Sequence, residues 1–330
     1  MGADVRPVER SAEADAPHAG FSPVRACWVC GGTELRPVHT AVFSLPEFAD
    51  QDAELARYTG ATVRIVRCAG CGFGQPEALP SLPGYFERMY DQRWSAEWLE
   101  NDFRAGYKDL IFRTVLAALE RRVPPERRTL LDLGAHVGRL IHLAGRRGWR
   151  PEGIELNPAS SAFAARATGL PVHRADAREL SAGGRRYGAV TLVDVLEHIP
   201  DPVPVLEAAR SLLLPGGWIA VKVPHGRVQL WKEELRGRLR PRYRPTVADN
   251  LVHVSHFGPR SLRLALERAG FADVRVEVAA PELVTTGPRA ARAAANALRT
   301  AVWRAGRLVP RGAESPLGLH LQAYGRNPSA

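Results

Sequence analysis

The stretch over residues 130–138, with the sequence LLDLGAHVG, constrains the fold more than any other part of the chain. The apolar run over 129–133 predicts a buried strand. Glycines at 134 and 138 predict a sharp turn into a helix over about 138–147. The first turn of such a helix offers unpaired N–H groups and the positive end of a dipole, which suit a carboxylate or a phosphate. The stretch therefore predicts a site for a nucleoside-containing ligand.

The identity of that nucleoside depends on the residues around the turn. A second predicted strand ends at Glu155, where nucleotide-binding folds place the acid that binds ribose hydroxyls. A dinucleotide site requires the pattern G-x-G-x-x-G, but His136 and Arg139 occupy its second and third glycine positions. The pattern over 132–138 is instead D-x-G-x-H-x-G, which disfavours a nicotinamide-dinucleotide enzyme.

Length and composition bound the architecture. The 330 residues suit one large domain with a smaller one, and 45% hydrophobic residues are enough for a core. The net charge of +10 is compatible with nucleic acid, an anionic membrane surface, an anionic substrate or simply an arginine-rich composition. Residues 1–20 are polar without an apolar signal core, so we expect a disordered tail and a cytoplasmic protein.

All four cysteines lie in two C-x-x-C-G knuckles, Cys27 with Cys30 and Cys68 with Cys71. Two such knuckles place four thiolates around one cation, and a tetrahedral set of four sulfurs suits Zn²⁺. Disulfides are disfavoured in a chain without a signal sequence. Because four thiolates leave no open position for water, the zinc would be structural. We expect a zinc-binding module over 21–80, in which the alternating pattern over 62–67 predicts a strand that leads into the second knuckle.

The rest of the chain predicts a helical connector and then an alternating domain. Helices are expected within 81–122, over 85–89 and 94–122, covering the ligand site, and the second has an apolar stripe from Phe103 to Ala118. From residue 123 on, strands alternate with helices, which predicts an α/β fold with a parallel, doubly wound sheet. The predicted strands are 129–133, one ending at 155, 171–173, 187–194, 218–223, 271–278 and 317–324, the last antiparallel, and the helices between them include 158–168, 203–213 and 259–269.

Two further motifs are more specific than the glycine turn. The fourth strand runs into D-V-L-E-H-I-P-D-P from Asp194, and L-L-P-G-G over 213–217 precedes the fifth. Over 129–278 the chain resembles class I S-adenosylmethionine (SAM) methyltransferases, particularly the ubiquinone-pathway O-methyltransferases, with His136 in place of a motif glycine. The cysteine module resembles the zinc-binding N-terminal module of some bacterial methyltransferases, including deoxysugar C-methyltransferases, whose further C-terminal domain this chain has no room for.

The resemblance implies a mostly parallel seven-stranded sheet and a SAM site. Asp132 and Gly134 would bind the methionine end, Glu155 the ribose, and Asp176 the adenine. From spacing alone, Asp176 is equally suited to cap the turn at 177–180. The remaining residues that the resemblance implies for this site are Ala135, Gly138, Leu156, Ala177, Asp194 and Leu196.

Methyl transfer to oxygen needs the acceptor's proton removed. His198, at the carboxyl edge of the sheet, is the leading candidate for that base, although it could instead cap or pack the strand–helix turn. His253 and His256 are rivals, and their alternation allows both to face one side of an extended segment. Alternatively, Asp194, Glu197 and His198 could bind a catalytic Mg²⁺ or Zn²⁺.

Two insertions extend the predicted methyltransferase domain, at 225–250 and 287–310. The first contains the basic run LRGRLRPRYRP over 235–245, either a mobile loop or a lid for an anionic or lipid-linked substrate. The second is a basic amphipathic helix, better suited to docking on the domain than to peripheral membrane contact.

We therefore expect an enzyme that methylates a small-molecule, glycan or lipid-linked acceptor in a bacterial biosynthetic pathway, on oxygen or alternatively on carbon or nitrogen. A zinc-ribbon nucleic-acid-binding protein with a degenerate nucleotide domain is the competing hypothesis. It is disfavoured because the ribbon lacks the aromatic and basic pattern that reads nucleic acid.

Overall fold

The computed structural model describes residues 20–45, 48, 50–90, 95–240, 252–309, 313 and 318–328. Nearly all of the predicted tail over 1–20 lies outside the described residues. The part of the first predicted insertion that follows residue 240 also lies outside them. The helices are α1 Ala53–Ala56, α2 Tyr85–Tyr90, α3 Ala96–Ala105, α4 Asp109–Glu120, α5 Arg139–Gly145, α6 Pro158–Thr168, α7 Ala177–Ala182, α8 Pro202–Ser211, α9 Gly226–Leu239, α10 Pro259–Arg268 and α11 Arg289–Leu308.

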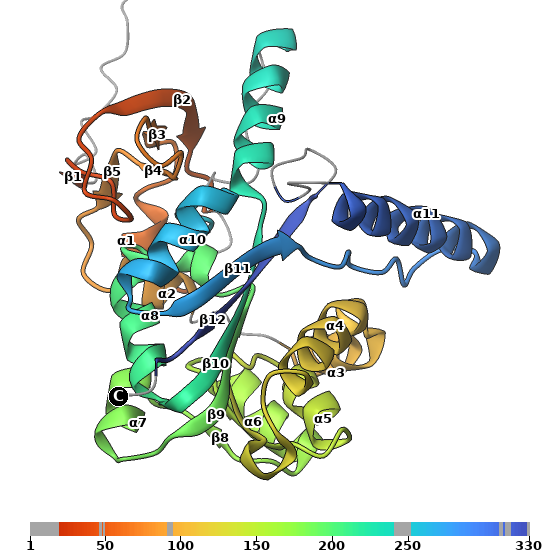
Figure 1. The fold of residues 1–330 in the computed structure, drawn as a ribbon. Coiled ribbons are helices and arrows are strands. Elements are labelled where there is room, and N and C mark those ends of the chain that lie inside the picture. Colours follow the sequence, from red (N-terminus) through yellow and green to blue (C-terminus); the bar gives the residue numbers. More distant parts are fainter. Residues whose placement is uncertain are drawn as a thin grey trace, which may run out of the picture.

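A seven-stranded sheet forms the centre of the molecule, as predicted (Figure 1). Its strands are β6 Thr129–Leu133, β7 Arg150–Ile154, β8 Val172–His173, β9 Tyr187–Val193, β10 Leu213–Pro224, β11 Ala272–Val278 and β12 His320–Arg326. The spatial order is β11-β12-β10-β9-β6-β7-β8. The five strands from β10 to β8 run parallel, and β12 is antiparallel to both of its neighbours, as predicted for the last strand.

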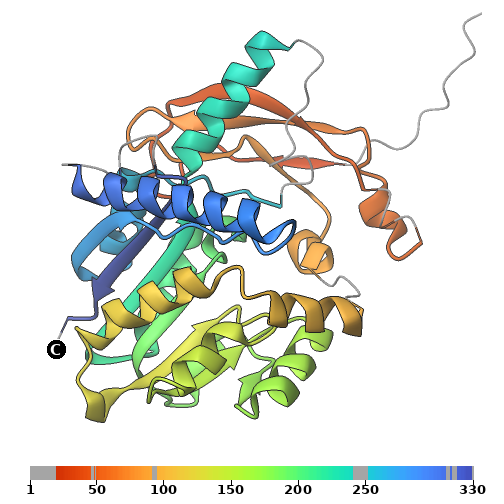
Figure 2. The ribbon, with the colours of Figure 1, turned by 90° about the vertical axis from the view of Figure 1, so that its right-hand side faces the viewer.

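Alternate residues of the central strands enter two apolar cores, one on each face of the sheet. Leu131 and Val190 pack in the same core as α8 and α10. Their neighbours Leu130 and Ala189 pack in the other core, with α4 and α5. Helices thus cover both faces, and Figure 2 shows α4 lying along the sheet. This covering on two sides explains why β9 is buried at every residue, as expected for a central parallel strand.

The predicted helical connector is interrupted. One helix was expected over 94–122, but α3 ends before Gly106, whose left-handed conformation (φ 61°) interrupts the helix before α4 begins. The expected start at Trp94 lies outside the described residues. The apolar stripe of this segment enters the core through Ile111, Val115 and Ala118, which are at most 2% exposed.

The N-terminal module contains two small antiparallel sheets. The strands are β1 Phe21–Pro23, β2 Leu35–Val42, β3 Thr62–Cys68, β4 Gly74–Pro76 and β5 Ala78–Pro80. One sheet has the order β2-β3-β4, and the other pairs β1 with β5. The strand predicted over 62–67 is therefore present as β3, and it leads into the second cysteine knuckle.

This module is joined to the large domain by backbone pairing and by shared cores. Gly74 of β4 and His256 exchange two backbone hydrogen bonds, of 3.0 and 2.8 Å. Phe73 packs edge-to-face on Phe257, with ring centroids 5.0 Å apart. The module has a small apolar core of its own, to which Leu230 of α9 also contributes. The residues that follow the second cysteine knuckle therefore contact residues 253–257, which contain His253 and His256 and are called the histidine segment below.

The predicted insertions are mainly helical. Residues 226–239, expected as a loop or a lid, form α9, and its predicted basic continuation over 241–250 lies outside the described residues. The second insertion forms α11, as predicted, and Trp303 anchors it through an indole N–H that donates to the Val278 carbonyl at 3.2 Å. Within the described ranges, none of the helices combines the length and apolar character needed to span a bilayer.

Candidate functional site

Three strand ends converge at the carboxyl edge of the sheet. Strand β6 lies between β7 and β9, so the order of the chain reverses there. In open α/β sheets, ligands bind outside the carboxyl ends of the strands at such a reversal. The glycine turn follows β6, Glu155 follows β7, and Asp194 follows β9. The topology therefore brings together residues that are up to about sixty positions apart in sequence.

The turn after β6 needs glycine on steric grounds. Gly134 has φ 76°, and a Cβ there would lie 2.5 Å from the Val195 side chain. Gly138 has φ 79° and precedes the first residue of α5, where an added Cβ would lie 3.0 Å from Ala164 and Thr168. The short turn thus places the N-terminus of α5 directly after the carboxyl end of β6.

His136 adopts the left-handed conformation at a position where the family motif has glycine (φ 48°). Histidine tolerates this conformation better than branched residues do. Its ring lies 5.6 Å from the Trp98 ring and its Nδ1 lies 3.6 Å from the Asp102 carboxylate, both on α3. The side chain therefore points away from the turn toward α3, so it leaves the ligand side of the loop open.

Glu155 holds the turn in place through its carboxylate. Its Oε2 accepts a hydrogen bond from the His136 N–H and its Oε1 accepts one from the Asn157 N–H, both at 2.8 Å. A carboxylate has about four lone-pair positions, so each oxygen keeps capacity for a ribose hydroxyl. Next to it, Leu156 is 62% exposed, an apolar side chain at the position expected to lie against the nucleoside.

Asp132 is buried beneath the turn. It is 4% exposed and accepts a hydrogen bond of 2.7 Å from the Thr191 hydroxyl on β9. Burial raises the pKa of Asp132 to about 7, a shift that this hydrogen bond partly opposes. A buried carboxyl with one protein donor is suited to receive a ligand's ammonium group, which would favour its ionised form. Ala135, 5% exposed, packs beside it against β7.

Two of the residues expected in the cofactor site have evident structural roles. Asp176 and Glu179 exchange hydrogen bonds with each other's backbone N–H groups, at 3.3 and 3.2 Å, in a capping box at the start of α7. Leu196 is fully buried within the apolar core, so its side chain does not reach the edge. Ala177, the first residue of α7, is partly buried. The capping alternative for Asp176 is thus present in the structure.

Asp194 is ionised and held by two lysines. Lys222 of β10 forms a short ion pair with its Oδ1, and Lys108, which precedes α4, lies 2.7 Å from its Oδ2. Burial opposes ionisation, but the two ammonium groups more than offset it, so the pKa of Asp194 lies below its ordinary value. Removing one member of a buried pair of this kind typically costs about 3–5 kcal/mol.

The two lysines are site residues that sequence reasoning did not identify. Lys222 is 1% exposed within an otherwise apolar strand, and this isolated charge in the run WIAVKVP was the available signal. Lys108 had no comparable signal, because only the packing of α4 against the sheet brings it to Asp194. Asp194 itself has φ 56°, a strained backbone that the ion pairs help to hold.

His198 lies in a short 3₁₀ turn after Asp194, with one ring nitrogen fixed. Its Nδ1 lies 2.6 Å from the Val252 carbonyl oxygen, which can only accept, so Nδ1 carries the proton. Nε2 is then left with a free lone pair. Burial lowers the pKa of His198 below its ordinary value of 6.5, which keeps the ring neutral near pH 7. The ring packs edge-to-face against Tyr90, with centroids 5.4 Å apart.

His253 and His256 differ in their access to this edge. The ring centroid of His253 lies 4.7 Å from that of His198, and burial lowers the pKa of His253 to about 4. His256 is 2% exposed, and neither of its ring nitrogens has a hydrogen-bond partner among the described residues. Its backbone pairs with Gly74, so it lies at the junction with the N-terminal module. The expected alternation therefore does not place the two rings in equivalent environments.

Glu197 lies between these groups and is 2% exposed. Burial raises the pKa of Glu197 to about 8, and the nearby Asp194 carboxylate adds to the shift. One carboxylate oxygen of Glu197 and one ring nitrogen each of His198 and His253 lie within 4.8 Å of one another. This spacing could hold a divalent cation. The predicted alternative set differs, because it included Asp194, whose charge is already balanced by two lysines.

The four cysteines converge as predicted. The sulfurs of Cys27 and Cys71 are 3.6 Å apart and those of Cys30 and Cys68 are 3.4 Å apart. These separations are too long for disulfides and close to the roughly 3.8 Å edge of a tetrahedral zinc–sulfur site. The hydrogen bond from Cys71 lowers the pKa of the Cys27 thiol to about 5. The set therefore fits a Zn²⁺ ion with no coordination position left over.

Comparisons with known proteins agree with this geometry. The family model described as "Methyltransferase domain" matches residues 103–276. Among curated proteins, the ubiquinone biosynthesis O-methyltransferase of Paracidovorax citrulli is 32% identical over 42% of this chain and 60% of its own length. That of Cereibacter sphaeroides is 33% identical over 33% of this chain and 48% of its own length. The chain thus spans about half the length of these curated relatives.

Solved structures with a similar arrangement include SAM-dependent methyltransferases from Archaeoglobus fulgidus and Mesorhizobium loti. The first is 17% identical, with a TM-score of 0.43, over 70% of this chain and 100% of that one. The second is 18% identical, with a TM-score of 0.45, over 67% of this chain and 100% of that one. Because the family model matches more than half of the sequence, the chain belongs to the methyltransferase-domain family.

Proposed function

We propose that this protein transfers a methyl group from SAM to an oxygen atom of a small-molecule or glycan acceptor in a bacterial biosynthetic pathway. The observation that carries this proposal is the glycine turn after β6, held by Glu155 at the topological reversal of a methyltransferase-family sheet. Both curated relatives compared above are named as O-methyltransferases, which supports oxygen as the acceptor atom.

The residues present fit SAM at both of its ends. Asp132 and the N-terminus of α5 would receive the ammonium and carboxylate of the methionine part. Glu155 would accept from the ribose hydroxyls, and Leu156 would cover the nucleoside. Asp176 remains a proposed adenine contact, since its carboxylate is exposed next to α7 as well as capping that helix.

The proposed reaction is an in-line displacement. When bound, SAM supplies an activated methyl group on a positively charged sulfur, which becomes a neutral thioether as the methyl leaves. The protein must therefore hold the acceptor oxygen in line with the methyl carbon and take up the hydroxyl proton. Asp194 and its lysines would line the sulfonium side of the site as a rigid wall.

We propose that Nε2 of His198 is the base that takes up the proton of the acceptor hydroxyl. Val252 fixes the tautomer in which this nitrogen carries a lone pair, and burial keeps the ring neutral. A general base of this kind contributes about 10²–10⁴-fold to the rate. His253 lies beside it and would orient the ring or the acceptor. The burial of His256 at the module junction makes it the weakest of the three candidates.

Equilibrium binding of SAM tests the core of the proposal. Calorimetry should give a micromolar dissociation constant, and Glu155→Ala should weaken binding at least tenfold because the ribose clamp and the support of the turn are both lost. Glu126→Ala, which changes an exposed glutamate away from the edge, is the matched control. No SAM binding by the intact chain, together with salt-dependent RNA binding, would support the nucleic-acid alternative instead.

A divalent cation at Glu197, His198 and His253 is a distinct catalytic possibility. It predicts that activity lost on chelation returns with added Mg²⁺ while the four-cysteine zinc is retained. If His198 acts as a base without a metal, chelation that leaves the knuckle zinc in place should leave turnover unchanged. Elemental analysis before and after chelation tells the two metals apart.

We also propose a structural Zn²⁺ at the four cysteines. The sulfur separations and the complete set of four thiols support it. The ion would fix two knuckles that otherwise close only through short turns. Its position beside Phe73, which packs on Phe257, suggests that it supports the histidine segment rather than taking part in chemistry.

A further inference from the structure

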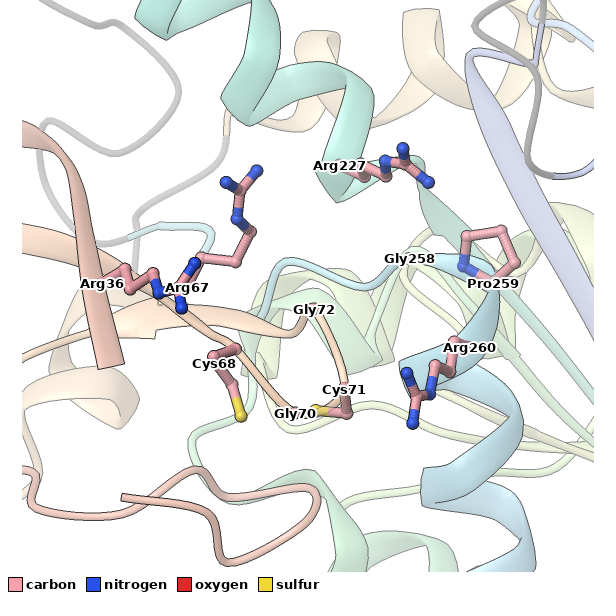
Figure 3. A pocket seen from close by; sticks show the side chains of 11 residues that line it. Arg36, Arg67, Cys68, Gly70, Cys71, Gly72, Arg227, Gly258, Pro259 and Arg260 are labelled. Carbon is pink, nitrogen blue, oxygen red and sulfur yellow. The ribbon is translucent and has the colours of Figure 1, made fainter. Parts of the chain in front are cut away.

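A second cavity lies between the cysteine knuckles and the large domain. Its volume is about 450 Å³, and its lining includes the second knuckle over 68–72. Arg36 and Arg67 reach it from β2 and β3, whereas Arg227 and Arg260 reach it from α9 and α10 (Figure 3). No acidic residue lines it. The cavity thus gathers four cationic side chains from two parts of the molecule.

Three of the four arginines have no acidic partner in the described part of the chain. Arg36 pairs with Glu34 at 2.5 Å. No described carboxylate oxygen lies within 4.0 Å of Arg67, Arg227 or Arg260. Like charges around one cavity repel each other, but Arg36, Arg227 and Arg260 are exposed, so solvent screens the repulsion to a small cost that a bound anion would remove.

The positions of two of these arginines make the cost greater. Arg227 is the second residue of α9 and Arg260 is the second residue of α10. Neither helix has an acidic residue in its first turn. The positive end of a helix dipole disfavours a cation there and favours an anion. Two helices therefore present both their N-termini and an arginine where a negative ligand would be stabilised.

We propose that this cavity binds the phosphate or diphosphate group of a small molecule. The guanidinium fork matches phosphate oxygens in pairs, which accounts for arginine on both walls. The volume falls within the range of about 300–1,000 Å³ that is usual for small-molecule sites. A half-open cavity of this size fits a compact group, whereas a nucleic-acid backbone requires an extended positive track.

The arginines could instead balance the knuckle itself. Cys68 and Cys71 line the cavity, and four thiolates around Zn²⁺ carry a formal negative charge. If that were their only role, replacing them would weaken zinc retention and leave anion binding unaffected. Zinc content therefore has to be measured in every variant.

The test is calorimetric titration of the full, zinc-loaded chain with inorganic pyrophosphate. Saturating S-adenosylhomocysteine blocks the proposed SAM site, so that pyrophosphate cannot bind there. The variants are Arg67→Gln and Arg260→Gln, one from each wall. Arg57→Gln is the control, because Arg57 is an exposed arginine of the N-terminal module that does not line the cavity. Uridine diphosphate serves as a second probe that lacks adenine.

We expect saturable pyrophosphate binding that each wall variant weakens at least tenfold, or about 1.4 kcal/mol, with full zinc content. Arg260→Lys should recover part of the loss, since it keeps the charge but not the fork. Tighter binding of uridine diphosphate would indicate a nucleotide-linked ligand, and equal binding a ligand recognised by its diphosphate alone.

Four results would overturn the proposal, three of them from binding and one from zinc content. The first is an absence of saturable binding, and the second is equal weakening by Arg57→Gln. The third is tight binding of a single-stranded RNA that pyrophosphate cannot displace, which would make the cavity part of a nucleic-acid surface. Loss of zinc in the wall variants with unchanged pyrophosphate affinity would assign the arginines to the knuckle.

Discussion

The edge of the sheet combines three carboxyl groups in different protonation states. Asp194 is ionised because two ammonium groups face it, whereas burial favours the neutral forms of Asp132 and Glu197. The residues differ little in chemistry, so their surroundings decide the charge. Of these three carboxyl groups only Asp194 is held in the charged form, by the ammonium groups of Lys108 and Lys222.

At this scale the pH dependence of catalysis follows from His198. Its neutral ring is the active form of a base, and its pKa lies below 6.5. Protonation of His198 should therefore lower turnover only below about pH 6.5. His198→Ala should lower kcat by about 10²–10⁴-fold and remove this acidic limb. Steady-state rates across pH, with His256→Ala as the control, measure both effects.

Turnover of His198→Ala within a few-fold of wild type would show that another group takes the proton. The same conclusion would follow if His256→Ala, rather than His198→Ala, removed the acidic limb while SAM affinity stayed unchanged.

A second residue-scale prediction concerns the stability of the ligand-free protein. The ordinary pKa of Asp132 is 3.8 and its folded pKa is about 7. Between these values the unfolded chain releases a proton that the folded chain retains, so the free energy of unfolding falls as pH rises from about 4 to 7. Asp132→Asn should remove this slope. The melting temperature of the variant minus that of wild type should therefore be several degrees higher at pH 8 than at pH 4.

Differential scanning calorimetry of both proteins at pH 4 and pH 8 measures these melting temperatures. Parallel melting curves for wild type and Asp132→Asn across this range would contradict the raised pKa. Saturating SAM should reduce the difference, because a bound ammonium group would favour the ionised carboxyl.

At the scale of elements, the turn between β6 and α5 depends on Val195 as much as on its own residues. Gly134→Ala would place a Cβ 2.5 Å from the Val195 side chain and require it at φ 76°. We expect the variant to lose SAM affinity by at least tenfold and to melt several degrees lower. Calorimetry and thermal melting measure these two losses.

A compensating substitution makes this element-scale prediction sharper. Val195→Ala removes the methyl groups that the new Cβ would meet, but not the backbone strain. The double variant Gly134→Ala with Val195→Ala should therefore recover only part of the stability. Full recovery would show that contact alone, and not the left-handed backbone, requires glycine.

For the whole molecule, the shared core predicts that the N-terminal module and the large domain unfold as one cooperative unit. Cys68, Cys71 and Phe73 pack in the same core as Leu262 and Val221. Metal removal should therefore lower the melting temperature of the entire chain, in one transition, instead of melting a separate module. Thermal unfolding with and without a strong zinc chelator, followed by near-ultraviolet circular dichroism, tests this.

Two resolved transitions after chelation would contradict the shared core. A Cys30→Ser variant should reproduce the effect of the chelator, because one missing thiolate opens the four-sulfur set. Restored melting on addition of Zn²⁺ to the chelated wild type completes the test, and the variant should not be restored.

The sequence predicted the sheet and the chemistry at its edge to different extents. Strand β6 and helix α6 have the predicted bounds, because long apolar runs and caps are local signals. The cysteine set was predicted from spacing alone. Asp176 was left with two alternatives, since one Asp at a helix start can cap or bind, and the structure shows the cap.

The break at Gly106 and the helix α9 were missed for a physical reason. A single glycine within a periodic apolar stripe does not by itself predict a helix break, and the basic composition of 226–239 resembles that of a solvent-exposed loop. Packing decides both, since α4 must lie on the sheet and α9 contributes Leu230 to the core of the N-terminal module.

By itself, the sequence determined the order of strands and helices, the glycine turn, the four thiols and the methyltransferase-like motifs. Those features are local, and short-range sterics and hydrophobic periodicity encode them. Only the tertiary structure brought Lys108 and Lys222 to Asp194, fixed the His198 tautomer through Val252, and gathered arginines from two modules around one cavity. Contacts between residues far apart in sequence depend on how elements pack, and no local pattern carries that information.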